Sequence, residues 1–546
     1  MTTPVNQELE VSAAPAGCPM HSKKTADGVS RRGFIGALGA AGALAPGVCM
    51  MGASSAAHAQ TATTTIREDR FGRMFNLPPF ATPSAQLTAA LNELGKVGGI
   101  MDAKDPLEAG PILLITDPAL NVNNPNNTTQ TAGTTFLGQF IDHDVTFDLG
   151  STLGVPTRPE DSTNTRSPAM DLDSVYGGGP VRSPQLYGRR TFSNPLGGIK
   201  LRVEHGGLFE DLPRTADGTA ILGDPRNDEH VILAGLHAAF LLFHNEVVDH
   251  VAARNRRWST DEIFREAQRL VRWHYQWIIV HEFLPQVIGQ SLVNSILRNG
   301  RRVYRPSVGF MPVEFQGAVY RMGHSMVRPS YRANMLGDNG GPFFAFIFDP
   351  AAEGQTDPSD LRGGVRAPRR FVGWQTFFDF GDGEVKPNKR LDTTLSTPLF
   401  LLPRSAIAGE GGPISLAQRN LLRHVTWSLP SGQSIARAMG APVLASSDLA
   451  DVGALGANLG RSTPLWFYIL REAHVLGSGG NTLGPVGGRI VGEVLIGLLQ
   501  LNRNSYLRAQ PSWRPTLFNR LGQQTGDFKM VDLLTFAGVA PAQRGQ

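Results

Sequence analysis

The chain has 546 residues, of which 41% are hydrophobic and 18% charged, which is ordinary for a globular protein and excludes a disordered or fibrous chain. The formal net charge is only +4 and the Lys and Arg residues are scattered, so we expect no nucleic-acid partner. The 62 Gly and 38 Pro residues predict helices joined by many irregular loops.

Residues 1–59 are typical of a cleaved export signal. Residues 30–35 read Ser-Arg-Arg-Gly-Phe-Ile, a twin-arginine pattern, and an apolar stretch too short for a stable membrane span leads to Ala-His-Ala at 57–59. We therefore expect the twin-arginine export machinery to carry the folded protein to a periplasmic or secreted location. Cys18 and Cys49 precede the cleavage site, so the mature protein should contain no thiol and no disulfide.

The remainder predicts an N-terminal arm followed by one large domain. Residues 60–130 are rich in Pro, Asn and Thr and have few periodic stretches. Residues 131–546 show mainly helical periodicity, sparse strand-like alternation and no internal repeat. The predicted fold class is therefore mainly α, with long irregular loops and little β structure.

Several helices can be placed in chain order. Apolar residues recur at helical spacing over 229–255, and Asp224 precedes them as an N-cap candidate followed by proline. Ser259 and Glu262 predict a capping box for the next helix, which Pro285 and Gly289 should close. Further helices are expected at 313–327, 415–429, 463–476 and 487–501.

Residues 138–144, Gly-Gln-Phe-Ile-Asp-His-Asp, are the most informative stretch. On a helix, Gln139, Asp142 and His143 share one face, whereas Asp144 points elsewhere. One face can thus address a buried cofactor while the next residue serves another site. Acids beside a histidine also occur in solvated turns, so this stretch alone leaves both interpretations open.

A second segment, residues 167–173, places oxygen donors at every second position, a spacing that lets a loop curl around a hard cation. The candidate calcium ligands are the side chains of Ser167, Asp171 and Asp173, the carbonyl of Ala169, and the carboxylate of Asp144. Most acidic loops bind nothing, so the segment needs support from the rest of the chain.

Three pairs of polar residues, each three positions apart, stand where core packing would place aliphatic side chains. They are Arg226 with Glu229, Arg321 with His324, and Asn420 with Arg423. A histidine on a helix is more often a core or surface residue than a ligand. That interpretation is given to His237, His244, His274 and His281.

Together and in order, these motifs resemble the haem peroxidases of the peroxidase and cyclooxygenase superfamily, the myeloperoxidase-like group. The resemblance covers most of the chain from about Thr131, and it includes Val-Tyr-Gly at 175–177 and Leu-Pro at 429–430. It implies a large single-domain haem peroxidase fold. It also implies an enzyme, active in the response to oxidative stress, that reduces hydrogen peroxide to water through a ferryl intermediate while oxidising a small organic or (pseudo)halide donor.

The resemblance implies a role for each residue on the iron side of a haem b. His324 would bind the iron, and Asn420 would accept a hydrogen bond from the other ring nitrogen of that histidine. Arg321 and Arg423 match the arginines expected at the haem propionates, since a guanidinium suits a carboxylate.

On the opposite side, the resemblance implies that His143 would move the peroxide proton as a general acid and base. Arg226 would stabilise charge on the leaving oxygen, and Gln139 would orient peroxide, a halide or water. Asp142 and Glu229 match the two carboxylates that form ester bonds to haem in the mammalian members.

Three alternatives are weighed against a peroxidase. A fatty-acid dioxygenase of the same superfamily has a radical tyrosine three residues before the iron-binding histidine, but that position is Arg321 here and Tyr320 lies one further away. A non-haem metal phosphohydrolase could use the pair His143-Asp144, yet no matching further ligands can be assigned. An inactive haem-bearing adhesion protein would not need His143 and Arg226.

Overall fold

Helices dominate the computed structural model, which describes residues 67–546 except 206, 366 and 408–410. The twin-arginine segment and both cysteines lie outside the described residues. Thr63–Gln546 form one unit, and the sheets in its described part are two-stranded. The prediction of a mainly α fold is confirmed, whereas the division between an arm and a catalytic domain stays a prediction.

The α-helices are α2 (Ala85–Leu94), α3 (Gly110–Thr116), α4 (Ala132–Val145), α5 (Asp173–Tyr176), α6 (Gly179–Arg182), α7 (Val231–Arg254), α8 (Thr260–Ile278), α9 (Leu284–Ile288), α10 (Gln290–Asn299), α11 (Val313–Gly317), α12 (Leu416–Thr426), α13 (Gly432–Met439), α14 (Ala450–Gly453), α15 (Leu465–Leu476), α16 (Pro485–Leu501), α17 (Tyr506–Ala509) and α18 (Met530–Phe536). The strands are β1 (Phe71–Gly72), β2 (Asn126–Thr131), β3 (Glu204–His205), β4 (Glu210–Asp211), β5 (Met311–Pro312), β6 (Ser330–Asp338), β7 (Gly341–Phe346) and β8 (Pro387–Lys389). β1 pairs with β5 in parallel, and β2–β8, β3–β4 and β6–β7 are antiparallel pairs.

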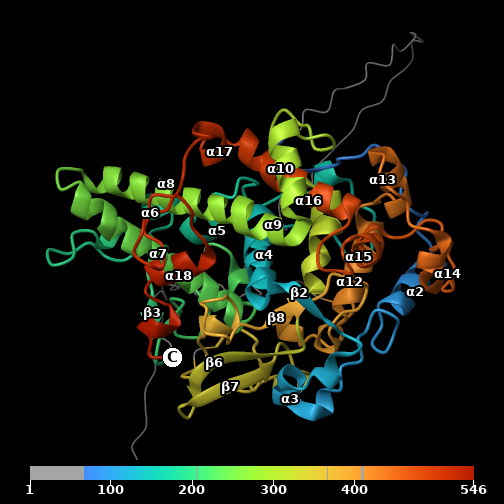
Figure 1. Cartoon of the computed structure of the whole chain (residues 1–546), viewed down its shortest axis with the longest axis horizontal. Coiled ribbons are helices and arrows are strands. Elements are labelled where there is room, and N and C mark those ends of the chain that lie inside the picture. The colour runs from blue at the N-terminus through green and yellow to red at the C-terminus, as the bar shows by residue number, and fades with distance from the viewer. Residues whose placement is uncertain (1–66, 206, 366, 408–410) are drawn as a thin grey trace, which may run out of the picture. The chain divides into compact units, whose positions relative to one another are not determined.

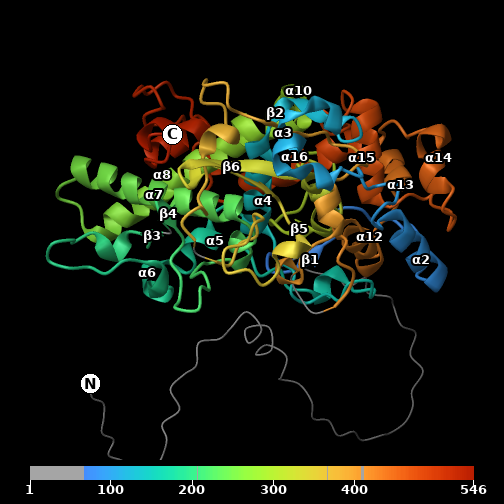
Figure 2. The same ribbon diagram turned by 90° about the horizontal axis from the view of Figure 1, so that it is seen from below.

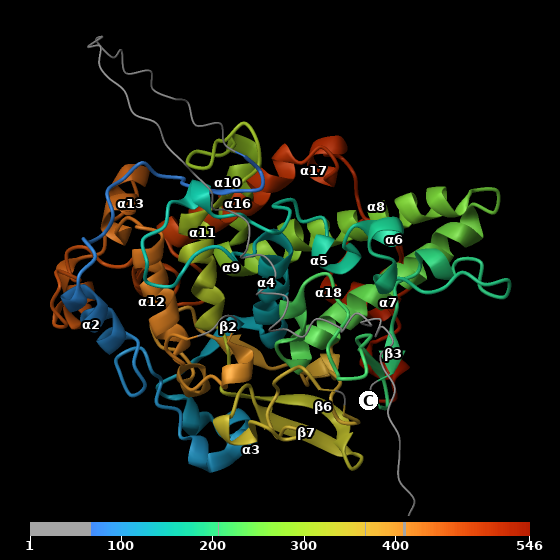
Figure 3. The same ribbon diagram turned by 180° about the vertical axis from the view of Figure 1, so that it is seen from behind.

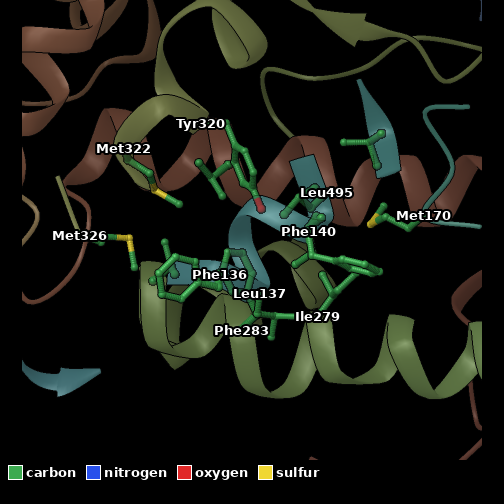
Figure 4. Packing of buried hydrophobic residues seen from close by; sticks show 14 of the residues in the cluster. Phe136, Leu137, Phe140, Met170, Ile279, Phe283, Tyr320, Met322, Met326 and Leu495 are labelled. Atoms are coloured by element: carbon green, nitrogen blue, oxygen red, sulfur yellow. The ribbon is translucent and has the colours of Figure 1, made fainter. Parts of the chain in front are cut away.

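Helix α4 lies between α7 on one side and α12 on the other (Figures 1 and 3). Its apolar residues Phe136 and Phe140 are fully buried in the core around it (Figure 4). Gly133 lets α4 approach the backbone at Phe377 closely, because a Cβ at Gly133 would meet the Phe377 carbonyl oxygen at 2.5 Å. Packing on several sides therefore holds the polar side chains of α4 in fixed positions.

The predicted capping box of α8 is confirmed, since Ser259 and Glu262 each accept a hydrogen bond from the other's backbone N–H. The helical run closes at Gly289, the C-cap of α9, as predicted, whereas Pro285 does not end it. After α8 the chain continues through a π-helical turn, Ile279–Phe283, into α9, and Pro285 lies in the first turn of α9. Proline has no N–H and crowds the carbonyl four residues before it, and the wider π turn accommodates both effects.

The start of the predicted helix 229–255 is also corrected. Asp224 caps a separate 3-10 turn, Pro225–Asp228, and α7 begins only at Val231. The backbone of His230 is extended, and its ring nitrogen Nδ1 accepts the N–H of Leu233 as the true N-cap of α7. The backbone N–H of Glu229 donates to the Arg226 carbonyl at 3.0 Å within the 3-10 geometry of this turn, so Arg226 and Glu229, three residues apart, still share a face, as predicted.

The predicted helix 313–327 is two elements. α11 ends at Gly317, Ala318 leaves helical geometry with φ −139° and ψ −70°, and a 3-10 turn follows over Val319–His324. Because a 3-10 helix has three residues per turn, Arg321 and His324 still share a face, as predicted from their spacing.

The residues that open the described chain pack against segments far along the sequence. Phe71 pairs with Met311, and Figure 2 shows β1 and β5 close to α12. The buried Glu314 carboxylate accepts the backbone N–H groups of residues 74 and 75 at 3.0 and 3.2 Å. Arg73 donates to the Trp427 carbonyl at 2.7 Å. This segment is therefore part of the core and not a loose extension.

Within the described part of the chain, α7 is the one helix long and apolar enough to cross a membrane. Its most apolar stretch is 78% buried inside the fold, where α7 packs against α4 and α8. Burial of this kind is typical of the core helix of a globular domain.

Candidate active site

His143 lies on α4 with 4% of its surface exposed. Its Nδ1 lies 2.9 Å from Oδ1 of Asn227, and because an amide oxygen only accepts, Nδ1–H is the donor. Burial, reinforced by the positive charge of Arg226, lowers the pKa of His143 to about 3. The ring is therefore neutral near pH 7, and the lone pair on Nε2 is available to accept a proton.

Arg226 is held beside His143 from the 3-10 turn before α7. Its Nε and one terminal nitrogen donate to the Asp224 carboxylate at 3.0 and 2.8 Å, and it also donates to the His143 carbonyl at 3.2 Å. The guanidinium carbon lies 4.1 Å from the centre of the Phe147 ring. The remaining terminal nitrogen is 3.9 Å from the Asp142 carboxylate. The structure thus fixes a positive charge next to His143.

Gln139 is held by two residues that directly precede α7. Since Nδ1 of His230 is an acceptor, its Nε2–H donates to Oε1 of Gln139 at 2.8 Å. The Gln139 amide in turn donates to the Glu229 carboxylate at 3.3 Å. Gln139 and Glu229, predicted from separate motifs, are therefore neighbours in space.

The second half of the site joins the 3-10 turn of His324 to α12. The amide of Asn420 lies beside His324, as predicted, but its nitrogen and not its oxygen faces Nδ1 of His324, at 2.7 Å. The predicted direction of this hydrogen bond is reversed in the structure. The reason is that Arg321 donates to the Asn420 amide oxygen at 3.3 Å and draws it toward the guanidinium.

The two arginines of this half lie in a setting that suits an anionic ligand. Nε of Arg321 is buried and has no hydrogen-bond partner among the described residues. Burial and the neighbouring charge of Arg423 lower the pKa of Arg321 to about 9. Arg423 pairs with Asp148 at 3.6 Å, whereas no carboxylate in the described part of the chain lies within ion-pair distance of Arg321. Carboxylates such as haem propionates would supply one, so these residues fit haem.

Asp142 connects the two halves. Burial raises the pKa of its carboxyl, and the charges of Arg226, Arg321 and Arg423 oppose that shift. One side chain of α4 therefore interacts with the arginine beside His143 and with both arginines beside His324. Asp142 is therefore within electrostatic range of arginines from both halves of the site.

The carboxylates of the predicted cation site also come together. Asp144, Asp171 and Asp173 each place one oxygen within 4.8 Å of the others, the only such group of potential metal ligands in the described chain. Burial and the repulsion of its two neighbours raise the pKa of Asp144 well above its usual value, and burial raises that of Asp173 to about 6. A divalent cation would relieve this repulsion, so the cluster fits calcium.

The two other predicted ligands make different contacts in this structure. The backbone N–H of Ser167 donates to Asp173 at 2.9 Å, and the Ala169 carbonyl accepts from the amide of Asn502 at 3.1 Å. After Ala169 the loop is strained, since Met170 and Leu172 adopt left-handed backbone angles with φ of 48° and 61°. This alternation turns Asp171 and Asp173 toward Asp144.

Sequence reasoning missed the residues behind these side chains. Asn227 lies between His143 and His237 and donates to Nδ1 of His237 at 2.9 Å. Asp224 was expected only as a helix cap, yet it also binds the Arg226 side chain. The position of Asn227 next to Arg226 in one turn was the available signal, but nothing in the sequence relates it to His237.

Parts of the sequence match known proteins named as peroxidases. The sequence model of the family described as Animal haem peroxidase matches residues 147–340, which include His324 but neither α4 nor α12. Peroxidase skpo-1 of Caenorhabditis elegans is 30% identical over 175 residues, 32% of this chain and 25% of the relative. Thyroid peroxidase of Sus scrofa is 25% identical over 299 residues, 50% of this chain and 30% of the relative. The matched segments therefore span less than a third of the length of these relatives.

Two solved structures share the fold. Peroxidase A from Dictyostelium discoideum superposes with a TM-score of 0.54 over 85% of this chain and 92% of its own, at 16% identity. Fatty acid alpha-dioxygenase from Arabidopsis thaliana gives a TM-score of 0.51 over 80% of this chain and 73% of its own, at 15% identity. At such identities the likeness shows the fold alone. By sequence, residues 147–340 of the chain are similar to the animal haem peroxidase family.

Proposed function

We propose that the protein is an exported haem peroxidase that reduces hydrogen peroxide to water while oxidising a small organic or (pseudo)halide donor. The observation that carries the proposal is the buried His143, whose Nδ1–H donates to Asn227 and leaves Nε2 as the acceptor nitrogen, with the Arg226 guanidinium bound to its backbone carbonyl. The family match and the relatives named peroxidase support it. Twin-arginine export to the periplasm or beyond is proposed from residues 30–35.

His324 would be the ligand of the haem iron, because a neutral imidazole is a common ligand of that metal. Arg321 and Arg423 would bind the propionates. A carboxylate that takes over the Arg321 guanidinium would release the amide oxygen of Asn420, which could then accept the Nδ1–H of His324. Bound haem would supply the redox chemistry of the reaction.

His143 would take a proton from hydrogen peroxide at Nε2 and return it to the departing oxygen as water forms. Arg226, anchored by Asp224, would stabilise negative charge on that oxygen. Gln139, held by its two neighbours, would orient peroxide or water. Asp142 and Glu229 remain candidates for ester bonds to haem.

The fatty-acid dioxygenase alternative is not favoured by the side chains near His324. Arg321 occupies the position three residues before His324 and binds Asn420. The Tyr320 ring stacks on Phe315 with 4.5 Å between ring centres, and its hydroxyl points into the packed core beside α4 (Figure 4). These side chains therefore favour a peroxidase over a fatty-acid dioxygenase.

The proposal is tested on the purified, haem-loaded protein. We expect a Soret band that changes when hydrogen peroxide is added, and oxidation of guaiacol that depends on peroxide. Acid-acetone extraction then shows whether the haem is covalently attached. Absence of a Soret band would point to a non-haem protein, and a Soret band without guaiacol oxidation would point to an inactive haem-bearing protein.

Calcium removal is expected to lower activity and stability together. Asp144 is adjacent to His143 on α4, so a cation that fixes one residue restricts the other. Saturating calcium at a hundred times its Kd would contribute about 2.7 kcal/mol of stability. Peroxidase rate and the thermal unfolding midpoint should both fall on chelation and recover when calcium is returned.

The variant Asp171→Asn should reproduce this loss in the presence of calcium. Asp261→Asn, which alters an exposed carboxylate at the start of α8, should not. Unchanged activity and stability after thorough chelation would contradict the calcium site.

A further inference from the structure

We infer that Asn227 and His237 form a positioning pair, whose hydrogen bonds hold the ring proton of His143 on Nδ1 and so keep its Nε2 free as the base. This inference rests on the proposed function, since it concerns the base of that reaction. Neither residue would touch peroxide or haem for this purpose. Both would act through His143 alone.

The three side chains form one buried row. His143, Asn227 and His237 are 4%, 0% and 1% exposed, and each of the two hydrogen bonds that connect them is 2.9 Å long. An amide has two unlike ends, because its oxygen accepts and its nitrogen donates. With the oxygen toward His143 and the nitrogen toward His237, the first ring must carry its proton on Nδ1 and the second must not.

The row joins three separate elements that pack against one another. His143 lies on α4, Asn227 in the 3-10 turn Pro225–Asp228, and His237 on α7. The backbone N–H of Asn227 also donates to the Asp224 carbonyl at 3.1 Å, which fixes the turn. Burial lowers the pKa of His237 to about 4, so this ring is neutral near pH 7 and can accept the hydrogen bond.

His237 disfavours the flipped orientation of the Asn227 side-chain amide. If the Asn227 amide rotated by half a turn, its NH₂ group would face Nδ1 of His143 and move the ring proton to Nε2, where it would block proton uptake. The amide oxygen would then face the lone pair on Nδ1 of His237. That arrangement is repulsive unless the ring proton of His237 moves from Nε2 to Nδ1 at the same time. Rotation of the Asn227 amide therefore requires a tautomer change in His237 as well as in His143.

The pair can be separated from simple packing by combining two substitutions in the haem-loaded protein. Asn227→Leu removes the acceptor and should slow the reaction with hydrogen peroxide about tenfold or more, because the wrong tautomer cannot act as base. Asn227→Asp should keep the rate within about threefold of the unaltered protein, because a carboxylate accepts the same hydrogen bond through either oxygen. Since a carboxylate has no wrong orientation, it should not need His237.

The decisive comparison is His237→Phe in both backgrounds. With Asn227 present, we expect the rate to fall at least about twofold, because the two amide orientations become comparable. In the Asn227→Asp protein, the same substitution should leave the rate unchanged. Stopped-flow recording of the Soret band gives the rate, and cyanide affinity gives a second readout without turnover, since hydrogen cyanide also transfers its proton on binding. His250→Phe, on the same helix but away from the row, is the matched control.

Equal slowing by His237→Phe in both backgrounds would show that His237 acts by packing and would overturn the inference. An unaltered rate in Asn227→Leu would do the same. If Asn227→Leu fails to fold, the effects of His237→Phe in the protein with Asn227 and in the Asn227→Asp protein still test the inference. Failure of the proposed function looks different, since the unaltered protein itself would then show no Soret band or no reaction with peroxide.

Discussion

Replacement of His143 by leucine is expected to slow the reaction of the haem-loaded protein with hydrogen peroxide by about 10²- to 10⁴-fold, the usual contribution of a general acid-base group. Leucine has a similar volume but no nitrogen, so proton uptake from peroxide is lost while the packing of α4 is kept. The second-order rate constant from stopped-flow recording of the Soret band measures the effect. Haem content should stay unchanged, because His143 is not the proposed iron ligand.

The matched control is His205→Leu, which removes an exposed histidine on β3. This variant should react at the unaltered rate. A His143→Leu protein that kept both its haem and a rate within about threefold of the control would show that another group moves the proton.

His324→Gly is expected to lose the axial ligand and, with it, most of the affinity for haem. Loss of a partner that merely supports a metal ligand costs about 10- to 100-fold in affinity, and loss of the ligand itself should cost at least as much. The readout is the Soret band after gel filtration, compared with that of His143→Leu at the same protein concentration. Added imidazole should restore the band, because it can fill the space that the side chain leaves.

Such rescue separates loss of a ligand from loss of the fold. A His324→Gly protein that retained haem with an unaltered spectrum would assign the iron ligand to another residue. A protein that neither bound haem nor responded to imidazole would be checked by its thermal unfolding midpoint.

Local signals predicted much of the fold. Ser259 and Glu262 occur with the spacing of a capping box, and the helix starts where that pattern requires. The start of α7 was predicted wrongly because Asp224 caps a separate 3-10 turn, and His230, a less common N-cap residue, caps the α-helix itself. The break after Gly317 was missed because apolar periodicity does not distinguish an α-helix from a short 3-10 helix such as Val319–His324.

The candidate site was predictable as a set of residues but not as a network. Motif spacing selected His143 and His324, and the structure surrounds each with polar partners. Motif spacing could not show that Asn227 lies between two histidines, since such contacts depend on how α4 and α7 pack. Nor could it give the amide orientation of Asn420, which depends on a hydrogen bond from Arg321, 99 positions away.

The contacts of the first described residues set an order of assembly. Phe71 needs a partner strand at 311–312, and Arg73 needs the carbonyl of Trp427, so neither can reach its final place until that part of the chain has been synthesised. Closing such long loops is slow, because the chain entropy is lost before the contacts form. Residues that leave the ribosome early are thus among the last to dock.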